Sequence, residues 1–313
     1  MKVAICGAWH VHAKDYAKHA TELGEIVGVY EENEKLRREF LEKFDVPVFD
    51  TLDALLASDA EGVIVCSASC DHADHMVKIA NAKKHIFTEK VLALTDEDCD
   101  RVDAAVKENG VRFVISLFQK SLAPRRAVKA TMDSGELGKI NYIRFRNCHS
   151  GSTRNWLPSH FYNAKECGGG AMIDLGAHGM YLTHWLLGMP DTFKSTFTLA
   201  CEDPAVLEKN SDRLEDNAVT VMGYKNGAIA INETGFVSNY SPVVLEVFGE
   251  TGYVRMTDNA VVKRVSGSGG EIPVELPEKE PLPIVQFLTG DIRDGYGMEE
   301  AKALTHMMVK AYE

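Results

Sequence analysis

The fold of the first half of this chain follows from the stretch Lys2-Val-Ala-Ile-Cys-Gly7. Its consecutive apolar residues predict a buried strand, and its glycine predicts a tight turn into a helix. A strand that turns directly into a helix offers backbone N–H groups to a dinucleotide pyrophosphate. The full fingerprint for such a ligand has three glycines, whereas Trp9 and His12 stand at the second and third of these positions. Taken alone, the motif is therefore weak.

Short apolar runs alternate with amphipathic runs from Met1 to about Leu117. Strands are expected at Lys2–Cys6, Glu25–Tyr30, Val46–Phe49, Gly62–Cys66, His85–Thr88 and Val111–Ser116. Helices are expected at Lys14–Leu23, Glu34–Lys43, Leu52–Ala57, Asp71–Ala82 and Asp96–Asn109. Asp96, preceded by Thr95, is the expected N-cap of the last helix. This alternation predicts an α/β Rossmann domain over residues 1–120, a doubly wound parallel sheet covered on both faces.

The pattern changes after Pro124. Helices are expected at Arg125–Ser134 and, closing the chain, at Met298–Tyr312. Strands are expected at Lys139–Asn147, Thr192–Cys201, Asp216–Tyr224, Ala228–Phe236, Val243–Gly249, Gly252–Met256 and Val261–Val265. Lys225-Asn226-Gly227 between two of these strands predicts a hairpin. We therefore expect an α+β domain over residues 121–313 with a largely antiparallel open sheet.

Composition and charge exclude several classes of partner. A net charge of −12 disfavours nucleic acid and anionic membranes. No apolar run reaches the length of about 18 residues that a membrane-spanning helix needs, and the N-terminus leads directly into a strand rather than a signal peptide. Seven cysteines without a C-x-x-C pair fit reduced thiols. These features predict a cytoplasmic protein with no membrane or nucleic-acid partner.

An acidic residue ends the second expected strand. Glu31 lies 24 residues after Gly7 (31 − 7 = 24), near the spacing at which a carboxylate binds the ribose hydroxyls of a dinucleotide. A carboxylate at this position repels a 2′-phosphate, so NAD is the expected cofactor and NADP is disfavoured. The alternative interpretation is that Glu31 and Glu32 form a solvated turn.

A glycine-rich segment in the second half carries candidate acid–base chemistry, Gly168-Gly-Gly-Ala-Met-Ile-Asp174-Leu-Gly-Ala-His178. Its glycines favour a loop that permits close approach, because each would cost about 1 kcal/mol inside a helix. If a helix begins near Ala171, Asp174 and His178 lie at i and i+4 on one face. A carboxylate beside an imidazole orients the ring and fixes its tautomer, as a general acid–base pair needs. The alternative is a buried histidine whose hydrogen bonds are satisfied within its helix.

The residues just before these glycines are candidates for binding substrate. Trp156, His160 and Tyr162 mix aromatic and polar groups, as a site that stacks on a sugar ring would. A packed loop is an equally good interpretation of this segment.

Histidine spacing does not predict a metal site. His10 and His12 form an H-x-H pair, but zinc normally needs a third and a fourth ligand at a legible spacing. A second group of acids and histidines over Asp71–His75 would scatter over more than one face of a helix. We therefore expect no metal.

Several further motifs occur in order along the chain. The segment Val63–His72 covers a strand and the following turn, the position at which one enzyme family usually carries a T-P-N-x-x-H pattern. The segment His85–Val91 matches the E-K-P motif of the same family, except that valine replaces the proline. The segment Gly168–His178 matches a G-G-G…D-x-G-x-H signature, and Gly135–Ile140 leads into a strand in a similar way. Together these segments resemble the Gfo/Idh/MocA family of dinucleotide-dependent oxidoreductases over nearly the whole chain.

The resemblance implies a role for each matched position. Lys90 would lie beside the nicotinamide and hydrogen-bond the reacting hydroxyl, while His178, paired with Asp174, would take the hydroxyl proton. The implied cofactor contacts, including those argued above, are Gly7, Trp9, His10, His12, Glu31, Ser67, His72, Glu89 and Lys90. The expected substrate contacts are Lys90, Trp156, His160, Tyr162, Asp174 and His178.

The resemblance also implies an assembly and shows departures from the family pattern. The second domain would supply the sugar pocket and, through the outer face of its sheet, the interface of a homodimer or homotetramer. Many members carry an acid three residues after the signature histidine, whereas this chain has Tyr181 there. That change points to an altered substrate pocket.

These residues predict an NAD-dependent oxidoreductase that acts on a secondary alcohol of a sugar, cyclitol or sugar derivative. Because nicotinamide chemistry carries the hydride, the protein supplies orientation and a proton acceptor. An imidazole titrates near neutral pH and suits that role, whereas a lysine is better used as a charged donor to a developing alkoxide. Two alternatives stay open, an NAD-retaining enzyme that cleaves glycosides through transient oxidation and a non-catalytic regulator that binds NAD or sugar.

Overall fold

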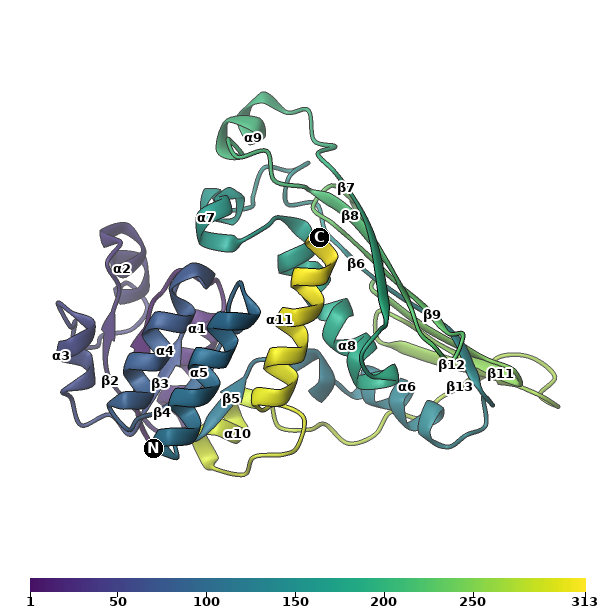
Figure 1. Cartoon of the computed structure of the whole chain (residues 1–313), viewed down its shortest axis with the longest axis horizontal. Coiled ribbons are helices and arrows are strands. Elements are labelled where there is room, and N and C mark those ends of the chain that lie inside the picture. Colours follow the sequence, from purple (N-terminus) through teal and green to yellow (C-terminus); the bar gives the residue numbers. More distant parts are fainter. The chain divides into compact units, whose positions relative to one another are not determined.

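Five parallel strands form the first sheet, in the order β2-β1-β3-β4-β5. The computed structural model describes all residues from Met1 to Glu313 (Figure 1). The strands are β1 (Lys2–Cys6), β2 (Glu25–Tyr30), β3 (Gly62–Val65), β4 (His85–Thr88) and β5 (Phe113–Ile115). The prediction of a parallel α/β sheet is confirmed.

The expected strand Val46–Phe49 is reduced to a single parallel bridge between Val29 and Val48. Val29 donates its N–H to the carbonyl of Pro47 at 2.9 Å and accepts the N–H of Phe49 at 2.8 Å. Pro47 has no N–H to donate, so the ladder cannot extend toward the N-terminus. With this bridge counted as a strand beside β2, the order corresponds to that of the Rossmann fold.

Helices from two distant parts of the chain cover this sheet. They are α1 (Ala13–Leu23), α2 (Glu34–Leu41), α3 (Leu52–Leu56), α4 (His72–Asn81), α5 (Asp96–Asn109) and α10 (Pro283–Thr289). Helix α4 packs against α5, and α1 packs against α10. Residues 281–306, which the sequence analysis assigned to the second domain, therefore belong to the first compact unit with residues 1–117. Phe287 of α10 is fully buried, with its ring 5.8 Å from that of Phe87 in β4.

The N-cap of α5 is Thr95 rather than the expected Asp96. The Thr95 hydroxyl accepts the N–H of Asp98 at 3.1 Å from an extended backbone, whereas Asp96 already lies in the first turn. An acid in the first turn still interacts favourably with the helix dipole.

The second unit, residues 118–280 and 307–313, is built on an eight-stranded sheet in the order β13-β12-β11-β10-β6-β9-β8-β7. Its strands are β6 (Ile140–Cys148), β7 (Thr192–Thr198), β8 (Asn217–Gly223), β9 (Ile229–Gly235), β10 (Val244–Gly249), β11 (Gly252–Thr257), β12 (Ala260–Val265) and β13 (Ile272–Pro273). Only β6 and β9 pair in parallel, so the prediction of a largely antiparallel sheet is confirmed. The expected hairpin joins β8 to β9, with Gly227 at a φ of +90°.

One face of this sheet is covered and the other is open. The helices of the unit are α6 (Ala123–Asp133), α7 (Ala164–Cys167), α8 (Ala177–Leu187) and α9 (Pro204–Lys209). Helices α6 and α8 pack on the sheet, and buried residues alternate with exposed ones along β8. The closing helix α11 (Met298–Tyr312) contributes its last turns, from Met307, to this unit. No helix of the chain combines the length and apolar character needed to cross a membrane.

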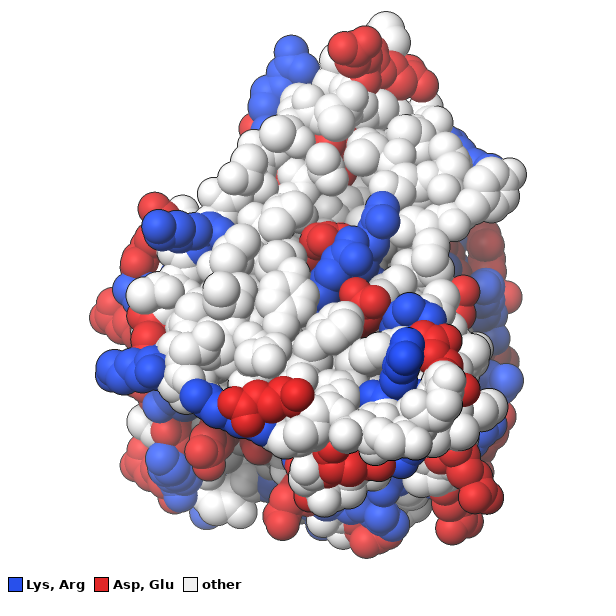
Figure 2. Space-filling model, turned by 90° about the vertical axis from the view of Figure 1, so that its right-hand side faces the viewer, with Lys and Arg blue, Asp and Glu red and all other residues white.

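The open face of the sheet is broad and mostly uncharged. Val219, Val221 and Ile229 are 37–43% exposed there. At its centre, Arg144 pairs with Glu233 at 2.8 Å and with Glu246 at 3.5 Å. Figure 2 shows a side of the molecule on which uncharged side chains surround small groups of adjacent cations and anions.

Candidate functional site

Gly7 lies where β1 and β3 diverge, at the carboxyl edge of the first sheet. Its φ is +90°, and a Cβ atom there would lie 2.4 Å from the backbone nitrogen of Ser67. Its N–H donates to the carbonyl of Tyr30 at 2.7 Å. Glycine is therefore required by the protein's own backbone at the switch point of the sheet, the place where doubly wound folds bind ligands. Trp9, two residues later, is buried with 8% of its surface exposed.

Glu31 is a buried carboxylate rather than part of a solvated turn. It accepts the N–H of Ala8 at 2.6 Å and the N–H of Asn33 at 2.8 Å. Burial raises the pKa of its carboxyl, although these two N–H groups oppose that shift. The guanidinium of Arg37 donates to the Glu31 carbonyl at 3.0 Å. The end of β2 is thereby tied to the loop that follows β1.

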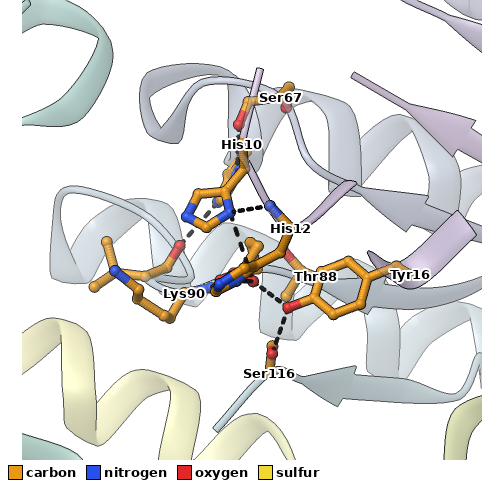
Figure 3. Close-up of polar contacts among 10 residues, drawn as sticks. His10, His12, Tyr16, Ser67, Thr88, Lys90 and Ser116 are labelled. Carbon is orange, nitrogen blue, oxygen red and sulfur yellow. Dashed lines mark hydrogen bonds and ion pairs between the residues drawn. The ribbon is translucent and has the colours of Figure 1, made fainter. Parts of the chain in front are cut away.

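A network of polar side chains lies between the loop after β1 and the end of β4 (Figure 3). His12 Nδ1 lies 2.7 Å from Glu89 Oε1, and His10 Nδ1 lies 3.7 Å from the same oxygen. The Tyr16 hydroxyl donates to Glu89 and contacts the hydroxyl of Ser116 at 2.7 Å. Although burial opposes it, the charges of His10 and His12 hold the pKa of the Glu89 carboxyl well below its ordinary value.

Lys90 follows this carboxylate directly and is 6% exposed. Its backbone N–H donates to Glu89 Oε2 at 2.8 Å, and the peptide bond between Lys90 and Val91 is cis. The imidazole of His72 contacts the carbonyl of Val91 at 2.8 Å and that of Ser67 at 3.1 Å. Burial lowers the pKa of His72. His72 therefore connects the end of β3 to the segment that carries Lys90.

The helix begins at Ala171, as expected, but its first turn is not a regular α-helical turn. Residues Met172–Gly176 form a π-helix, and α8 starts only at Ala177. A π-turn has i→i+5 hydrogen bonds, so the segment around Asp174 is wider than a regular α-helical turn, and the pairing of Asp174 with His178 stays a prediction. The carbonyl of Gly176 accepts a hydrogen bond from Asn232 of β9 at 2.7 Å.

Other residues of the same chain lie very close to the glycines that precede this helix. A Cβ on Gly169 would lie 2.1 Å from the Tyr312 hydroxyl, and one on Gly170 would lie 2.0 Å from the carbonyl of Glu215. The Glu215 carboxylate accepts the N–H groups of Gly170 and Met172, both at 3.0 Å, and the Tyr312 hydroxyl at 2.6 Å. The predicted close approach occurs, but its observed partners are side-chain and backbone atoms of the same unit.

His178 is buried in α8 with 5% of its surface exposed. Its Nδ1 lies 2.9 Å from the hydroxyl of Tyr181, which also accepts the N–H of Gln119 at 3.2 Å. The ring of Phe118 meets the imidazole edge-on at 5.3 Å. Burial lowers the pKa of His149, and the Asp174 carboxylate opposes that shift.

The three substrate candidates differ in exposure. Trp156 is 52% exposed, with its ring 4.7 Å from that of His149. His160 is half-buried in a short 3₁₀ helix, Ser159–Tyr162. Tyr162 is only 2% exposed, its hydroxyl contacts Ser152 at 2.7 Å, and it packs in a core cluster. For Tyr162 the packed-loop interpretation describes the observed contacts.

The structure brings most of the predicted residues of the first unit together. In the first unit the group is Gly7, His10, His12, Glu31, Ser67, His72, Glu89 and Lys90, along the carboxyl edge of the parallel sheet. The sequence analysis missed Tyr16, although its i+4 spacing from His12 was a usable signal. It also missed Glu215, Asn232 and Tyr312, which hold the glycine segment from positions too distant along the chain to give a local pattern.

Solved structures share this fold over the whole chain. Aldose-aldose oxidoreductase from Caulobacter crescentus, complexed with glycerol, has a TM-score of 0.82 at 18% identity and covers 100% of this chain and 96% of its own. GenD2 from gentamicin A biosynthesis, in complex with NAD, has a TM-score of 0.80 at 21% identity and covers 100% of this chain and 93% of its own.

Curated relatives match part of the chain. Myo-inositol 2-dehydrogenase of Thermotoga maritima is 26% identical over 63% of this chain and 56% of its own length. D-glucoside 3-dehydrogenase of Escherichia coli is 26% identical over 76% of this chain and 71% of its own. The first relatives are thus matched over little more than half of their length, 56–57%.

Family models cover both units. Residues 1–117 match the model described as oxidoreductase family, NAD-binding Rossmann fold, and residues 125–255 match the GFO/IDH/MocA C-terminal domain. The chain therefore belongs to the Gfo/Idh/MocA family.

Proposed function

We propose that this protein is an NAD-dependent oxidoreductase that acts on a secondary alcohol of a sugar, cyclitol or sugar derivative. The names of its relatives, dehydrogenases of inositols and of a glucoside, support this substrate class. The observation that carries the proposal is the convergence of Gly7, Glu89 and Lys90 at the carboxyl edge of a parallel sheet, beside its switch point. Doubly wound folds bind dinucleotides at that edge.

The residues at this edge fit a dinucleotide. The loop after β1 leads into α1, whose first N–H groups suit a pyrophosphate. Glu31 is fixed at the end of β2, where a carboxylate accepts ribose hydroxyls and repels a 2′-phosphate, so we propose NAD rather than NADP. The nicotinamide, when bound, exchanges the hydride. Trp9, His10, His12, Ser67 and His72 remain our further candidates for contacts with the cofactor.

We assign to Lys90 the hydrogen bond to the reacting hydroxyl. Its position is set by the carboxylate that receives its own N–H and by His72, which holds the carbonyl of the next residue. A charged ammonium stabilises negative charge that develops on the alcohol oxygen, and such an interaction contributes a factor of about 10²–10³ in rate.

We assign proton acceptance to His178. An imidazole that accepts a proton at Nε2 carries a proton on Nδ1, and the Tyr181 hydroxyl at 2.9 Å can accept that Nδ1–H. The Tyr181 hydroxyl accepts a hydrogen bond from the backbone N–H of Gln119, which holds it in place. Tyr181 can therefore orient the imidazole ring of His178. Asp174 remains our candidate for a substrate contact, together with Trp156 and His160, whereas the burial of Tyr162 favours a supporting position.

We also propose a homo-oligomer that assembles through the open face of the second sheet. Exposed Val219, Val221 and Ile229 lie on one face with the ion-paired Arg144 and Glu233. A face that carries apolar residues and both signs of charge can pair with its own copy about a two-fold axis. Replacing Val221 with glutamate should lower the molar mass measured by light scattering. We propose a cytoplasmic location, because the reducing conditions of the cytoplasm suit seven free cysteines.

The test is to incubate the purified protein with NAD⁺ and a panel of inositols, free sugars and glycosides, following NADH by absorbance. We expect NADH to accumulate with at least one polyol, and turnover to fall about 10²–10⁴-fold in Lys90→Met and in His178→Asn. Lys78→Met is the matched control, because Lys78 lies in α4 and has no role in the proposed site. This variant should retain activity.

The same assay separates the alternatives. Cleavage of a glycoside without net NADH would replace our proposal with transient oxidation by a retained cofactor. Binding of NAD without turnover on any member of the panel, unchanged in Lys90→Met and His178→Asn, would replace it with a regulator.

A further inference from the structure

His10, His12 and Glu89 bring three metal-binding donor groups to one place. One nitrogen from each imidazole and one carboxylate oxygen lie within 4.8 Å of one another. The two histidines come from the loop between β1 and α1 (Figure 3). The carboxylate of Glu89 directly follows β4. The sequence analysis found no third ligand for the H-x-H pair, because the fold supplies it from 77 residues further along the chain.

We propose that His10, His12 and Glu89 bind one divalent transition-metal ion of the zinc type. Two imidazoles and one carboxylate form a donor set found in zinc sites that keep a fourth position for water or another ligand. Imidazole nitrogen favours zinc and neighbouring transition metals, whereas magnesium and calcium prefer sites built from oxygen. These three residues also belong to the proposed cofactor site, so metal binding is tested in the absence of NAD and substrate.

Two of the three ligand separations, those between each histidine and Glu89, require only small adjustments. Zinc bonds of about 2.0–2.1 Å in a tetrahedral arrangement place ligand atoms about 3.3 Å apart. The 3.7 Å between His10 Nδ1 and Glu89 Oε1 is close to that separation, and the 2.7 Å from His12 Nδ1 must open by about 0.6 Å. The backbone N–H of His12 donates to His10 Nδ1 at 3.2 Å, so an ion bound through this nitrogen would replace that hydrogen bond.

The surroundings hold the donors in place as the outer groups of a metal site do. Lys90 donates its N–H to the second carboxylate oxygen at 2.8 Å, and the Tyr16 hydroxyl donates to the first. Tyr16 is in turn fixed by Ser116 at 2.7 Å. Glu89 is 1% exposed, which limits competition by water, whereas His12 is 30% exposed and leaves a path for the ion. Such outer contacts orient ligands and commonly change metal affinity about 10–100-fold.

The consequence for the molecule is a link between two segments that carry candidate residues. An ion at this position would join the loop after Gly7 to the residue that precedes Lys90. Because the ion binds only the folded arrangement, it should also raise the thermal stability of the first unit.

The experiment titrates protein freed of metal by EDTA with ZnCl₂ in a calorimeter, without NAD or substrate. We expect one Zn²⁺ per chain, an increased melting temperature, and the visible absorption of tetrahedral Co²⁺ when cobalt replaces zinc. Glu89→Gln and His12→Asn should each lower the affinity at least about 100-fold, and Tyr16→Phe about 10-fold. His19→Asn is the matched control, because His19 faces Glu22 at 3.8 Å without a third donor.

The variants separate loss of ligation from loss of folding. Asparagine at position 12 retains an amide donor toward Glu89, so circular dichroism and the melting temperature of the metal-free protein should stay close to those of wild type. Less than about 0.1 Zn²⁺ per chain, or equal affinity in wild type and folded His12→Asn, would overturn the proposal. Dehydrogenase assays play no part in this result, so failure here would leave the proposed function intact.

Discussion

Gly7 and the glycines Gly169 and Gly170 occupy loops that look alike in the sequence but answer different physical demands. Gly7 adopts a φ of +90° and lies against the backbone of Ser67, on the adjoining strand end. Gly169 and Gly170 have no positive φ, and they are required because Tyr312 and Glu215 approach them closely. In the first loop, glycine permits the backbone conformation that the end of the parallel sheet needs. In the second loop, the missing side chain leaves room for residues from distant parts of the chain.

Alanine at position 7 should have the largest effect on stability. It would combine a strained φ, costing about 1–3 kcal/mol, with a clash against backbone, costing about 1–3 kcal/mol more. Gly170→Ala meets only the clash and should cost about 1–3 kcal/mol. Urea unfolding followed by circular dichroism measures both changes.

Gly269→Ala is the control for this comparison, because a Cβ there meets nothing within 4 Å and the φ is ordinary. It should change the free energy of unfolding by less than about 0.5 kcal/mol. Equal losses in Gly7→Ala and Gly170→Ala would show that backbone conformation does not distinguish the two loops.

Glu215→Ala tests how the second loop is held. It removes the carboxylate that accepts two backbone N–H groups and the Tyr312 hydroxyl, so it should cost about 1.5–3 kcal/mol. Glu215→Gln should cost less than about 1 kcal/mol, because all three hydrogen bonds go to one oxygen that the amide keeps. Hydrogen exchange should locate the loss in residues 170–176, and NAD binding by the first unit should stay unchanged. Weakened NAD binding would contradict this separation.

The same difference explains what could be predicted from the sequence. Strands such as Lys2–Cys6 and His85–Thr88 were predicted with the observed bounds, because buried parallel strands give continuous apolar runs. The convergence of Gly7, Glu31 and Lys90 followed from topology, since carboxyl ends of parallel strands meet at one edge. The roles proposed for these residues remain predictions.

The geometry of the second loop could not be predicted from the residues near it in the sequence. The π-turn at Met172–Gly176 is held at its ends by Glu215, which accepts the N–H of Met172 from 43 residues away, and by Asn232, which donates to the carbonyl of Gly176 from 56 residues away. The segment Pro281–His306 belongs to the first unit because its helix α10 packs against α1. The sequence near α1 gives no sign of this contact with a segment so distant along the chain. Local sequence therefore predicted elements, and long-range packing decided how the loops between them are held.

Tyr181→Phe tests the orientation of His178. The variant keeps the ring but removes the hydroxyl at 2.9 Å from Nδ1, so the tautomer and ring angle are no longer fixed. We expect kcat to fall about 10-fold with little change in KM, about 1.4 kcal/mol of transition-state free energy. A merely structural role would lower stability and leave the pH profile of kcat unchanged, whereas an orienting role should shift that profile.

Two histidines with lowered pKa values provide the finest comparison of the units. Burial lowers the pKa of His72 in the first unit and of His149 in the second, where the Asp174 carboxylate opposes the shift. A histidine kept neutral in the folded state takes up a proton on unfolding once the pH falls below about 6.5. Stability should therefore be constant above about pH 7 and decrease as the pH falls toward the folded-state pKa.

Each histidine contributes a slope of at most about 1.4 kcal/mol per pH unit. Comparing urea unfolding at about pH 7.5 and 5.5, His72→Gln should remove more of the pH dependence than His149→Gln, because His72 is 1% exposed and His149 is half-buried beside Asp174. Asp174→Asn should then steepen the contribution of His149, since it removes the charge that favours the imidazolium. If both histidine variants keep the slope of wild type, the acid sensitivity of the fold arises from other groups.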